Sequence, residues 1–197
     1  MKFLKIAFFV IVSLVLILAV VGFLQPDTIK IQVERVIKSP VCKVFHHVND
    51  MEKRLRWSTV ENLDSNVVTI LGDVTRGEGA SYTWANKQSG ATGGVKYLEV
   101  SHDEHIIGSV AFGEIQEGHE EIRFKEVRDG TRVTWFYRQK IGGNPFARIM
   151  GVFIRESFRP IYNESLKRLA EDIEQYPEMP ENCNEALSVL QAGEFLK

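Results

Sequence analysis

The chain has 197 residues, and its 24 basic and 26 acidic side chains give a net charge of −2. Because this balance provides no positive field to attract a phosphate backbone, it argues against a nucleic-acid-binding protein. After the N-terminal apolar segment about 170 residues remain without an internal repeat, which is enough for one domain with one hydrophobic core.

The first element is an uncharged run of nineteen residues from Ile6 to Leu24, interrupted only by Ser13 and Gly22. As a helix it would be about 28 Å long, close to the roughly 30 Å hydrocarbon core of a bilayer. A secretory signal has a shorter apolar stretch of about 7–15 residues, and a buried soluble helix would carry a polar stripe. We therefore expect a single-pass membrane anchor over residues 1–27, with a cleaved signal and a core helix as the alternatives.

The charges on either side of this run predict its orientation. Lys2, Lys5 and the amino terminus precede it, whereas Asp27 follows it before the next cation, Lys30. Since basic flanks stay on the cytoplasmic side, we expect a protein of the inner (cytoplasmic) membrane whose soluble domain lies outside the cytoplasm. In a Gram-negative bacterium that compartment is the periplasm.

The segment after the anchor begins with a strand, because apolar and polar residues alternate from position 28 to 34. Ser39 and Pro40 then predict a short helix with Ser39 as its N-cap, ending at Asn49-Asp50. A second short helix or turn, MEKRLRWS, brings Trp57 inward.

Six further strands follow in close succession, since runs of β-branched and aromatic residues are separated by short polar or glycine-bearing turns. We expect them at 67–71, 80–86, 94–101, 106–112, 120–127 and 132–141, with hairpin turns at 102–104 and 129–130. The last element is a long helix from Phe146 to Gln175, which Pro160 is expected to kink or split.

Several short motifs, in this order, resemble the SRPBCC superfamily, which includes polyketide cyclases, START-type lipid-transfer domains and the birch-pollen-allergen fold. They are the strand-Ser-Pro-helix start at 33–48, Gly-x-Gly-x-x-Tyr-x-Trp at 77–84, Gly-Thr-x-Val-x-Trp at 130–135 and Pro-Phe-x-Arg-x-Met-Gly at 145–151. None of these motifs is a catalytic signature.

The resemblance covers residues 28–175 and implies an α+β helix-grip fold. In this fold a curved, seven-stranded antiparallel sheet wraps around the long C-terminal helix and leaves an open cavity between them; here one N-terminal transmembrane helix precedes it. The resemblance also implies an apolar or amphipathic small ligand. Residues 176–197 lie beyond it as a C-terminal tail.

The candidate ligand site is a set of aromatic residues on one face of the sheet, with two more on the long helix. It comprises Tyr82, Trp84, Tyr97, Phe112, Phe124, Trp135, Tyr137, Phe158 and Tyr162. Buried tyrosine and tryptophan need partners for their polar atoms, which a lined cavity supplies; a simple core is the alternative. The leading hypothesis is a membrane-tethered module, attached through residues 6–24, that binds a small lipid, quinone or polyketide-like molecule.

Two other functions stay open, namely a polyketide cyclase or dehydrase type of enzyme and a closed-core envelope interaction module. An enzyme needs an acid or base inside the cavity. No aspartate, glutamate or histidine falls convincingly on the aromatic face, and Glu99, which shares the strand parity of Tyr97, is the only carboxylate to test. We expect no catalytic constellation and no cofactor.

No metal site is expected either. His102 and His105 flank two acids in HDEH, but residues three apart across a turn need not converge on one ion. Cys42 and Cys183 have neither metal-binding nor redox spacing. Outside the cytoplasm they are free to form a disulfide, but two lone cysteines in different elements are more often unpaired. The sequence determines neither the ligand nor the oligomeric state.

Overall fold

The computed structural model describes residues 2–59, 65–113, 116–180 and 183. In these residues the elements follow in the order α1 (Lys2–Leu24), β1 (Thr28–Ile37), α2 (Val41–Asn49), α3 (Met51–Trp57), β2 (Val67–Leu71), β3 (Ser81–Asn86), β4 (Thr92–Ser101), β5 (His105–Phe112), β6 (Gln116–Val127), β7 (Gly130–Lys140) and α4 (Pro145–Gln175). The expected succession of elements is confirmed.

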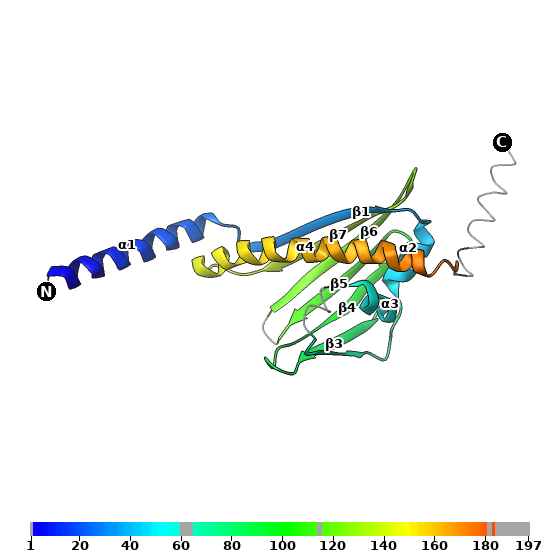
Figure 1. The fold of residues 1–197 in the computed structure, drawn as a ribbon, viewed down its shortest axis with the longest axis horizontal. Helices are drawn as coiled ribbons and strands as arrows, with labels where there is room; N and C mark the ends of the chain where they lie inside the picture. Colours follow the sequence, from blue (N-terminus) through cyan, green and yellow to red (C-terminus); the bar gives the residue numbers. More distant parts are fainter. Residues whose placement is uncertain (1, 60–64, 114–115, 181–182, 184–197) are drawn as a thin grey trace.

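The strands form one seven-stranded antiparallel sheet in the order β1-β7-β6-β5-β4-β3-β2. Helix α4 lies along this sheet (Figure 1). Helices α2 and α3 lie near the C-terminal end of α4, and α1 extends away from the N-terminal end of α4. The architecture is the α+β helix-grip fold that the resemblance implied.

The alternation read from the sequence determines which side chains form the core. On β7, Val133, Trp135 and Tyr137 are buried, while Thr134 and Phe136 between them are only partly covered. The turns at 102–104 and 129–130 connect β4 to β5 and β6 to β7, as expected. One side of the sheet is therefore a continuous apolar and aromatic layer.

The start of α2 differs from the expectation that Ser39 caps it. The N-cap is Pro40, and no side chain accepts a hydrogen bond there. The backbone of Ser39 is engaged with the sheet instead: its N–H donates to the Ile37 carbonyl at 2.8 Å, and its carbonyl accepts the Thr131 hydroxyl at 2.7 Å. Ser39 thus lies in the bend between β1 and α2, and its backbone rather than its side chain makes these bonds.

Helix α4 runs unbroken from Pro145 to Gln175, so Pro160 does not split it. Asn144 caps its start by accepting the N–H groups of Phe146 and Ala147 at 2.9 and 3.4 Å. Further along the helix, buried residues pack on the sheet at three- and four-residue intervals, namely Tyr162, Leu166, Leu169 and Ile173. This packing along one face fixes the part of the helix that follows the proline.

Within the part of the chain that the structure describes, one helix is long and apolar enough to cross a membrane, and it spans Phe3–Leu24 in α1. The side chains of α1 are almost all exposed. Its last turn meets α4 closely, since a Cβ on buried Gly22 would collide with the Pro145 carbonyl. The Arg148 guanidinium also donates to the carbonyls of Phe23 and Gln25, at 3.3 Å each.

Candidate ligand-binding site

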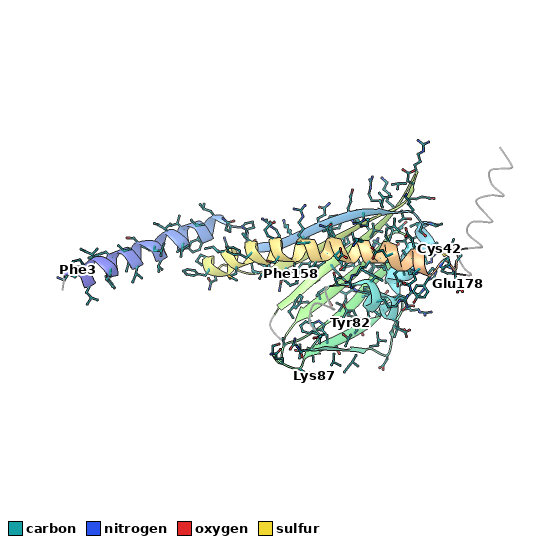
Figure 2. The ribbon with its side chains drawn as sticks, viewed as in Figure 1. Phe3, Cys42, Tyr82, Lys87, Phe158 and Glu178 are labelled. Atoms are coloured by element: carbon teal, nitrogen blue, oxygen red, sulfur yellow. A yellow bond between two sulfur atoms is a disulfide. The ribbon has the colours of Figure 1, made fainter. Side chains whose placement is uncertain are left out.

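A cavity of about 220 Å³ lies between the sheet and α4, beside residues 154–162. Figure 2 shows Phe158 on α4, whose side chain borders this space. The lining is mainly apolar and comprises Ile31, Phe112, Tyr137, Gln139, Ile154, Phe158 and Tyr162. Because ligand pockets usually measure about 300–1,000 Å³, this cavity suits a small ligand or one end of a longer chain.

Two strands position the sheet side of the cavity. Ile31 on β1 and Tyr137 on β7 are direct cross-strand partners and both point inward. The Tyr137 hydroxyl donates to Oε1 of Gln139 at 3.1 Å. Gly118 on β6 leaves room for the ring, since a Cβ there would lie 2.7 Å from Cε2 of Tyr137. The sheet therefore places one polar pair in an otherwise apolar wall.

The acidity of Tyr137 is clearly altered. Burial, with a smaller contribution from the charge of Glu120, raises the pKa of its phenol well above the usual value. The hydroxyl therefore stays protonated at neutral pH. Its single hydrogen is donated to Gln139, and a protonated phenol cannot serve as a general base.

The nine aromatic residues selected from the sequence divide into two groups and one intermediate case. Phe112, Tyr137, Phe158 and Tyr162 line the cavity. The Trp84 ring packs edge-on against Phe112, with the ring centroids 6.0 Å apart. The remaining four do not border the cavity and belong to the fully packed core, namely Tyr82, Tyr97, Phe124 and Trp135.

A buried ion pair lies where α3 covers the sheet, next to the cavity, since its Glu120 is the cross-strand partner of Tyr137. Arg54 of α3 and Glu120 of β6 are each 1% exposed, and Nη2 of Arg54 lies 2.9 Å from Oε2 of Glu120. The same oxygen accepts the Trp135 indole N–H at 3.1 Å. Nη1 of Arg54 also donates to the Tyr97 hydroxyl at 3.2 Å, which in turn donates to the Val48 carbonyl at 2.7 Å.

Three aromatic rings enclose this pair. The Arg54 guanidinium carbon lies 5.9, 5.7 and 5.2 Å from the ring centroids of Tyr82, Tyr97 and Trp135. Such contacts stabilise a cation that has been removed from water. The aromatic residues at this end therefore serve the ion pair, and we assign them a structural role.

Glu99, the one carboxylate selected for testing because of its parity with Tyr97, does not face the cavity. The β4–β5 register shifts between Tyr97 and Glu99, which breaks the simple alternation between them. The Glu99 side chain is 62% exposed and pairs with His105 at 3.0 Å. Glu120 is the carboxylate that faces inward, and its parity with Ile122 and Phe124 was the available signal.

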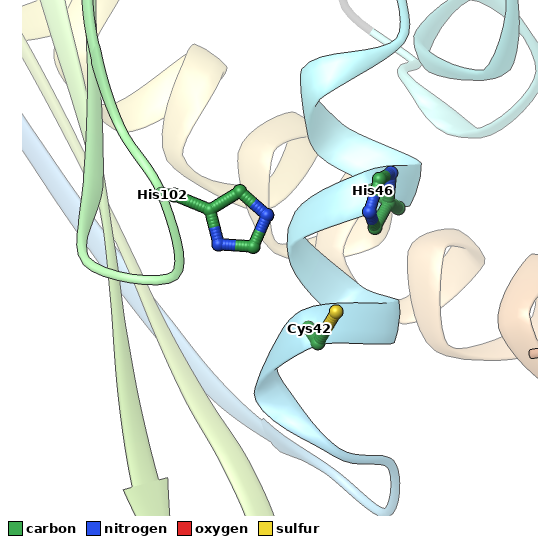
Figure 3. A group of neighbouring side chains, drawn as sticks. All are labelled: Cys42, His46 and His102. Atoms are coloured by element: carbon green, nitrogen blue, oxygen red, sulfur yellow. The ribbon is translucent and has the colours of Figure 1, made fainter. Parts of the chain in front are cut away.

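Three possible metal ligands lie together outside the cavity. Cys42 and His46 of α2 approach His102 of the β4–β5 turn, and their ligand atoms lie within 4.8 Å of one another (Figure 3). Burial, with a smaller effect of His102, lowers the pKa of His46 and keeps its imidazole neutral. The ligand types are thus suitable for a transition metal.

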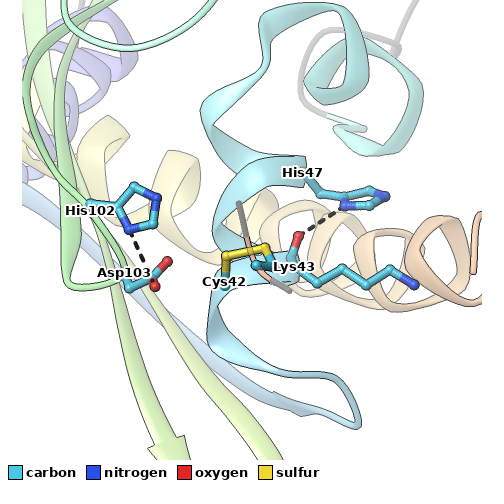
Figure 4. The surroundings of a disulfide bond; sticks show 6 residues. Cys42, Lys43, His47, His102 and Asp103 are labelled. Atoms are coloured by element: carbon cyan, nitrogen blue, oxygen red, sulfur yellow. Dashed lines mark hydrogen bonds and ion pairs between the residues drawn. A yellow bond between two sulfur atoms is a disulfide. The ribbon is translucent and has the colours of Figure 1, made fainter. Parts of the chain in front are cut away.

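The sulfur atom of this cluster is part of a disulfide bond. Cys42 is bonded to Cys183, so the expectation that the cysteines are unpaired was wrong (Figure 4). Metal ions bind the thiolate form of cysteine. While the disulfide is intact the cluster therefore offers two imidazoles, and Nδ1 of His102 already lies 3.3 Å from Asp103.

Comparison of the sequence with protein-family models gives a match over residues 28–174 to the polyketide cyclase / dehydrase and lipid transport family. The chain belongs to this family. The family description combines catalysis and lipid transport, so it fits ligand binding or cyclase activity. A search of curated proteins found no match to the sequence.

Solved structures with this fold include a protein of unknown function from Staphylococcus aureus, with a TM-score of 0.59 and 13% identity over 78% of this chain and 98% of that one. A Staphylococcus epidermidis protein gives a TM-score of 0.54 and 18% identity over 80% and 96%. DynU16, a protein in the dynemicin biosynthetic locus, gives a TM-score of 0.53 and 17% identity, over 76% of this chain and 48% of that one. These similarities establish the fold alone.

Proposed function

We propose that this family member is a membrane-tethered module that binds a small apolar or amphipathic ligand in the cavity between the sheet and α4. The observation that carries the proposal is the cavity of about 220 Å³ with its mainly apolar wall. Burying about 200 Å² of ligand apolar surface would contribute about 5 kcal/mol, before the cost of immobilising the ligand. The hollow also argues against a closed-core interaction module.

The tether rests on the apolar helix α1 and on the surface beside its end. Phe146, Met150 and Phe153, on the first turns of α4, are 47%, 56% and 62% exposed. Their spacing places them on one side of the helix, and Gly22 and Arg148 connect this part of α4 to the last turn of α1. An exposed apolar patch at the end of a spanning helix is suited to the membrane interface.

Catalysis by a polyketide cyclase or dehydrase type of enzyme is the second candidate, and the family description favours it. Among the residues described as lining the cavity, the titratable side chains are Tyr137 and Tyr162. Tyr137 is held protonated, and both inward-facing oxygens of Glu120 accept bonds from Arg54. Since these groups provide an acid and no base, we favour binding over catalysis.

The proposal is tested by identifying what copurifies with the full chain in mild detergent. Organic extraction and mass spectrometry should find an apolar compound in stoichiometric amount. The variant Phe158→Trp should lose it, because a larger ring fills the cavity. Phe153→Trp, on the exposed side of the same helix, is the matched control and should retain it. Equal amounts in both variants would contradict the cavity assignment.

The tether is tested on membranes of cells that express the full chain. We expect the protein to remain in the pellet after alkaline carbonate extraction and to keep residues 1–24 in its intact mass. A mature chain that begins near Phe23 would identify a cleaved signal and exclude the anchor.

A further inference from the structure

A groove of about 510 Å³ runs along the edge of the sheet between β1 and α4. Its charged lining consists of Lys30 on β1, Arg138 on β7, and Arg155, Glu156 and Arg159 on α4. Four cations thus face one carboxylate, which lies 2.9 Å from Nε of Arg155. The groove carries a net positive charge on a chain whose net charge is −2.

The cations are arranged in two unfavourable pairs. Lys30 and Arg138 are direct cross-strand partners, and like charges in that position destabilise a sheet. Arg155 and Arg159 are four residues apart on one helix face, where like charges are also destabilising. An anion bound between the two pairs would relieve both repulsions.

Three other arginines of the described chain lie beside acids. Arg56 pairs with Asp172 at 3.1 Å, Arg76 with Asp50 at 2.8 Å, and Arg132 lies 3.7 Å from Glu34. The groove departs from this pattern, since it concentrates four cations around one acid.

The groove and the apolar cavity adjoin each other. Ile31 and Tyr137 line both of them. Lys30 and Arg138 lie on the outer face of the sheet, and β1 is its edge strand. A molecule that bends around the β1 edge, past Arg155 and Arg159 of α4, would place its polar end among the four cations and its apolar end beside Phe158. The groove and the cavity together are therefore complementary to an amphipathic anion, which has one charged end and one apolar end.

We propose that the groove binds the anionic head group of an amphipathic ligand whose apolar chain occupies the cavity; this assignment rests on the binding function proposed above. Lys30 follows the last residue of α1 by six positions, so its Cα lies within about 20 Å of the end of that helix. The head-group groove is therefore close to the place where a tethered domain would meet the membrane surface.

The test compares two photoactivatable ligands with the same chain, a mid-chain diazirine analogue of decanoate and the corresponding primary alcohol. The full chain in neutral detergent is irradiated with each at alkaline pH, where the acid is ionised, and adducts are quantified by peptide mass spectrometry. We expect adducts on residues 154–162 with both ligands. The yield with the acid should exceed that with the alcohol by about fivefold to tenfold, the order for one or two charge-assisted hydrogen bonds.

The double variant Arg155→Gln/Arg159→Gln should reduce the adduct yield of the acid to that of the alcohol, and it should leave the adduct yield of the alcohol unchanged. Arg123→Gln/Arg132→Gln, which removes two paired cations outside the groove, is the matched control and should keep the preference. Equal yields of acid and alcohol in the unmodified chain, or a preference that survives the loss of Arg155 and Arg159, would overturn the head-group site. Absence of adducts with both ligands would instead contradict the binding function itself.

The source of the anion is distinguished in nanodiscs. If membrane phospholipid supplies it, phosphatidylglycerol should compete with the labelled acid and phosphatidylcholine should not. If neither lipid competes while the labelled acid still prefers the unmodified chain, the ligand is a free organic acid.

Discussion

The space between the sheet and the helices is filled where α2 and α3 cover it and hollow beside residues 154–162 of α4. At the filled end, Arg54 and Glu120 are each 1% exposed and three aromatic rings surround them. At the hollow end, Phe112 and Phe158 face open space. The comparison teaches that aromatic residues on one face of one sheet serve two purposes, which are to enclose an ion pair and to line a cavity.

Breaking the ion pair should have the largest effect on stability. Glu120→Gln removes the charge that balances Arg54, and an uncompensated buried charge costs about 3–5 kcal/mol of unfolding free energy. Denaturant unfolding of the full chain in detergent, followed by tryptophan fluorescence, measures this loss. Glu99→Gln, at the exposed pair with His105, is the matched control and should cost about 0–1 kcal/mol. Similar losses in the two variants would contradict the structural role of the pair.

Removing the disulfide should affect the filled end alone. Cys42 and Cys183 are separated by 141 positions, and loss of a disulfide that closes such a loop costs about 2–5 kcal/mol. Cys42→Ser/Cys183→Ser and the reduced unmodified chain should unfold at the same, lower denaturant concentration, with their ligand content unchanged. If a reductant does not shift the unfolding of the unmodified chain, the cysteines are not paired.

Truncating one phenylalanine at each end sharpens the comparison. Phe45 is 1% exposed and packs against Phe124 with ring centroids 5.6 Å apart, so Phe45→Ala should cost about 3–5 kcal/mol. Phe158→Ala should cost about 1 kcal/mol, because the ring already borders open space and loses fewer contacts. Equal costs, measured by the same unfolding assay, would mean that both ends are packed.

The smallest expected effect is a pH dependence at the filled end. His47 is buried, and its Nδ1 donates to the Lys43 carbonyl at 3.0 Å. Burial lowers the pKa of this imidazole, while nearby Asp172 opposes the change. The unfolded chain therefore takes up a proton first as the pH falls.

The sign of the effect follows from this order of protonation. The stability from neutral His47 is fully present above the unfolded pKa of about 6.5 and is lost as the pH falls toward the folded pKa. His47→Gln should flatten the unfolding free energy in this range. The same slope in the unmodified chain and in the variant would contradict the assignment.

Much of the fold could be predicted because its signals are local. Alternation at β7 and the spacing of apolar residues on α4 placed Trp135, Tyr137 and Tyr162 toward the same core. The family resemblance then supplied the topology, which alternation alone does not contain. The differences arose where the local rule is interrupted: a register shift turned Glu99 outward, and Ser39 bonds through its backbone rather than its side chain before α2.

The division of the nine aromatic residues between the cavity and the packed core could not be predicted, because it depends on contacts between distant segments. Arg54 lies in the charged stretch MEKRLR, yet it meets Glu120, 66 positions away, in the core. Cys183 reaches Cys42 across 141 positions. Whether a space is filled or hollow depends on how several elements pack together, which no single segment reveals.

The hollow end can be located most directly by mapping where a neutral apolar ligand reacts. The full chain in detergent is irradiated with the diazirine analogue of decan-1-ol, and each adduct is assigned to a residue by tandem mass spectrometry. The cavity predicts adducts on Phe112, Ile154, Phe158 and Tyr162, which unlabelled decan-1-ol should suppress. Adducts confined to α1, or found around Tyr97, would contradict a binding cavity beside α4.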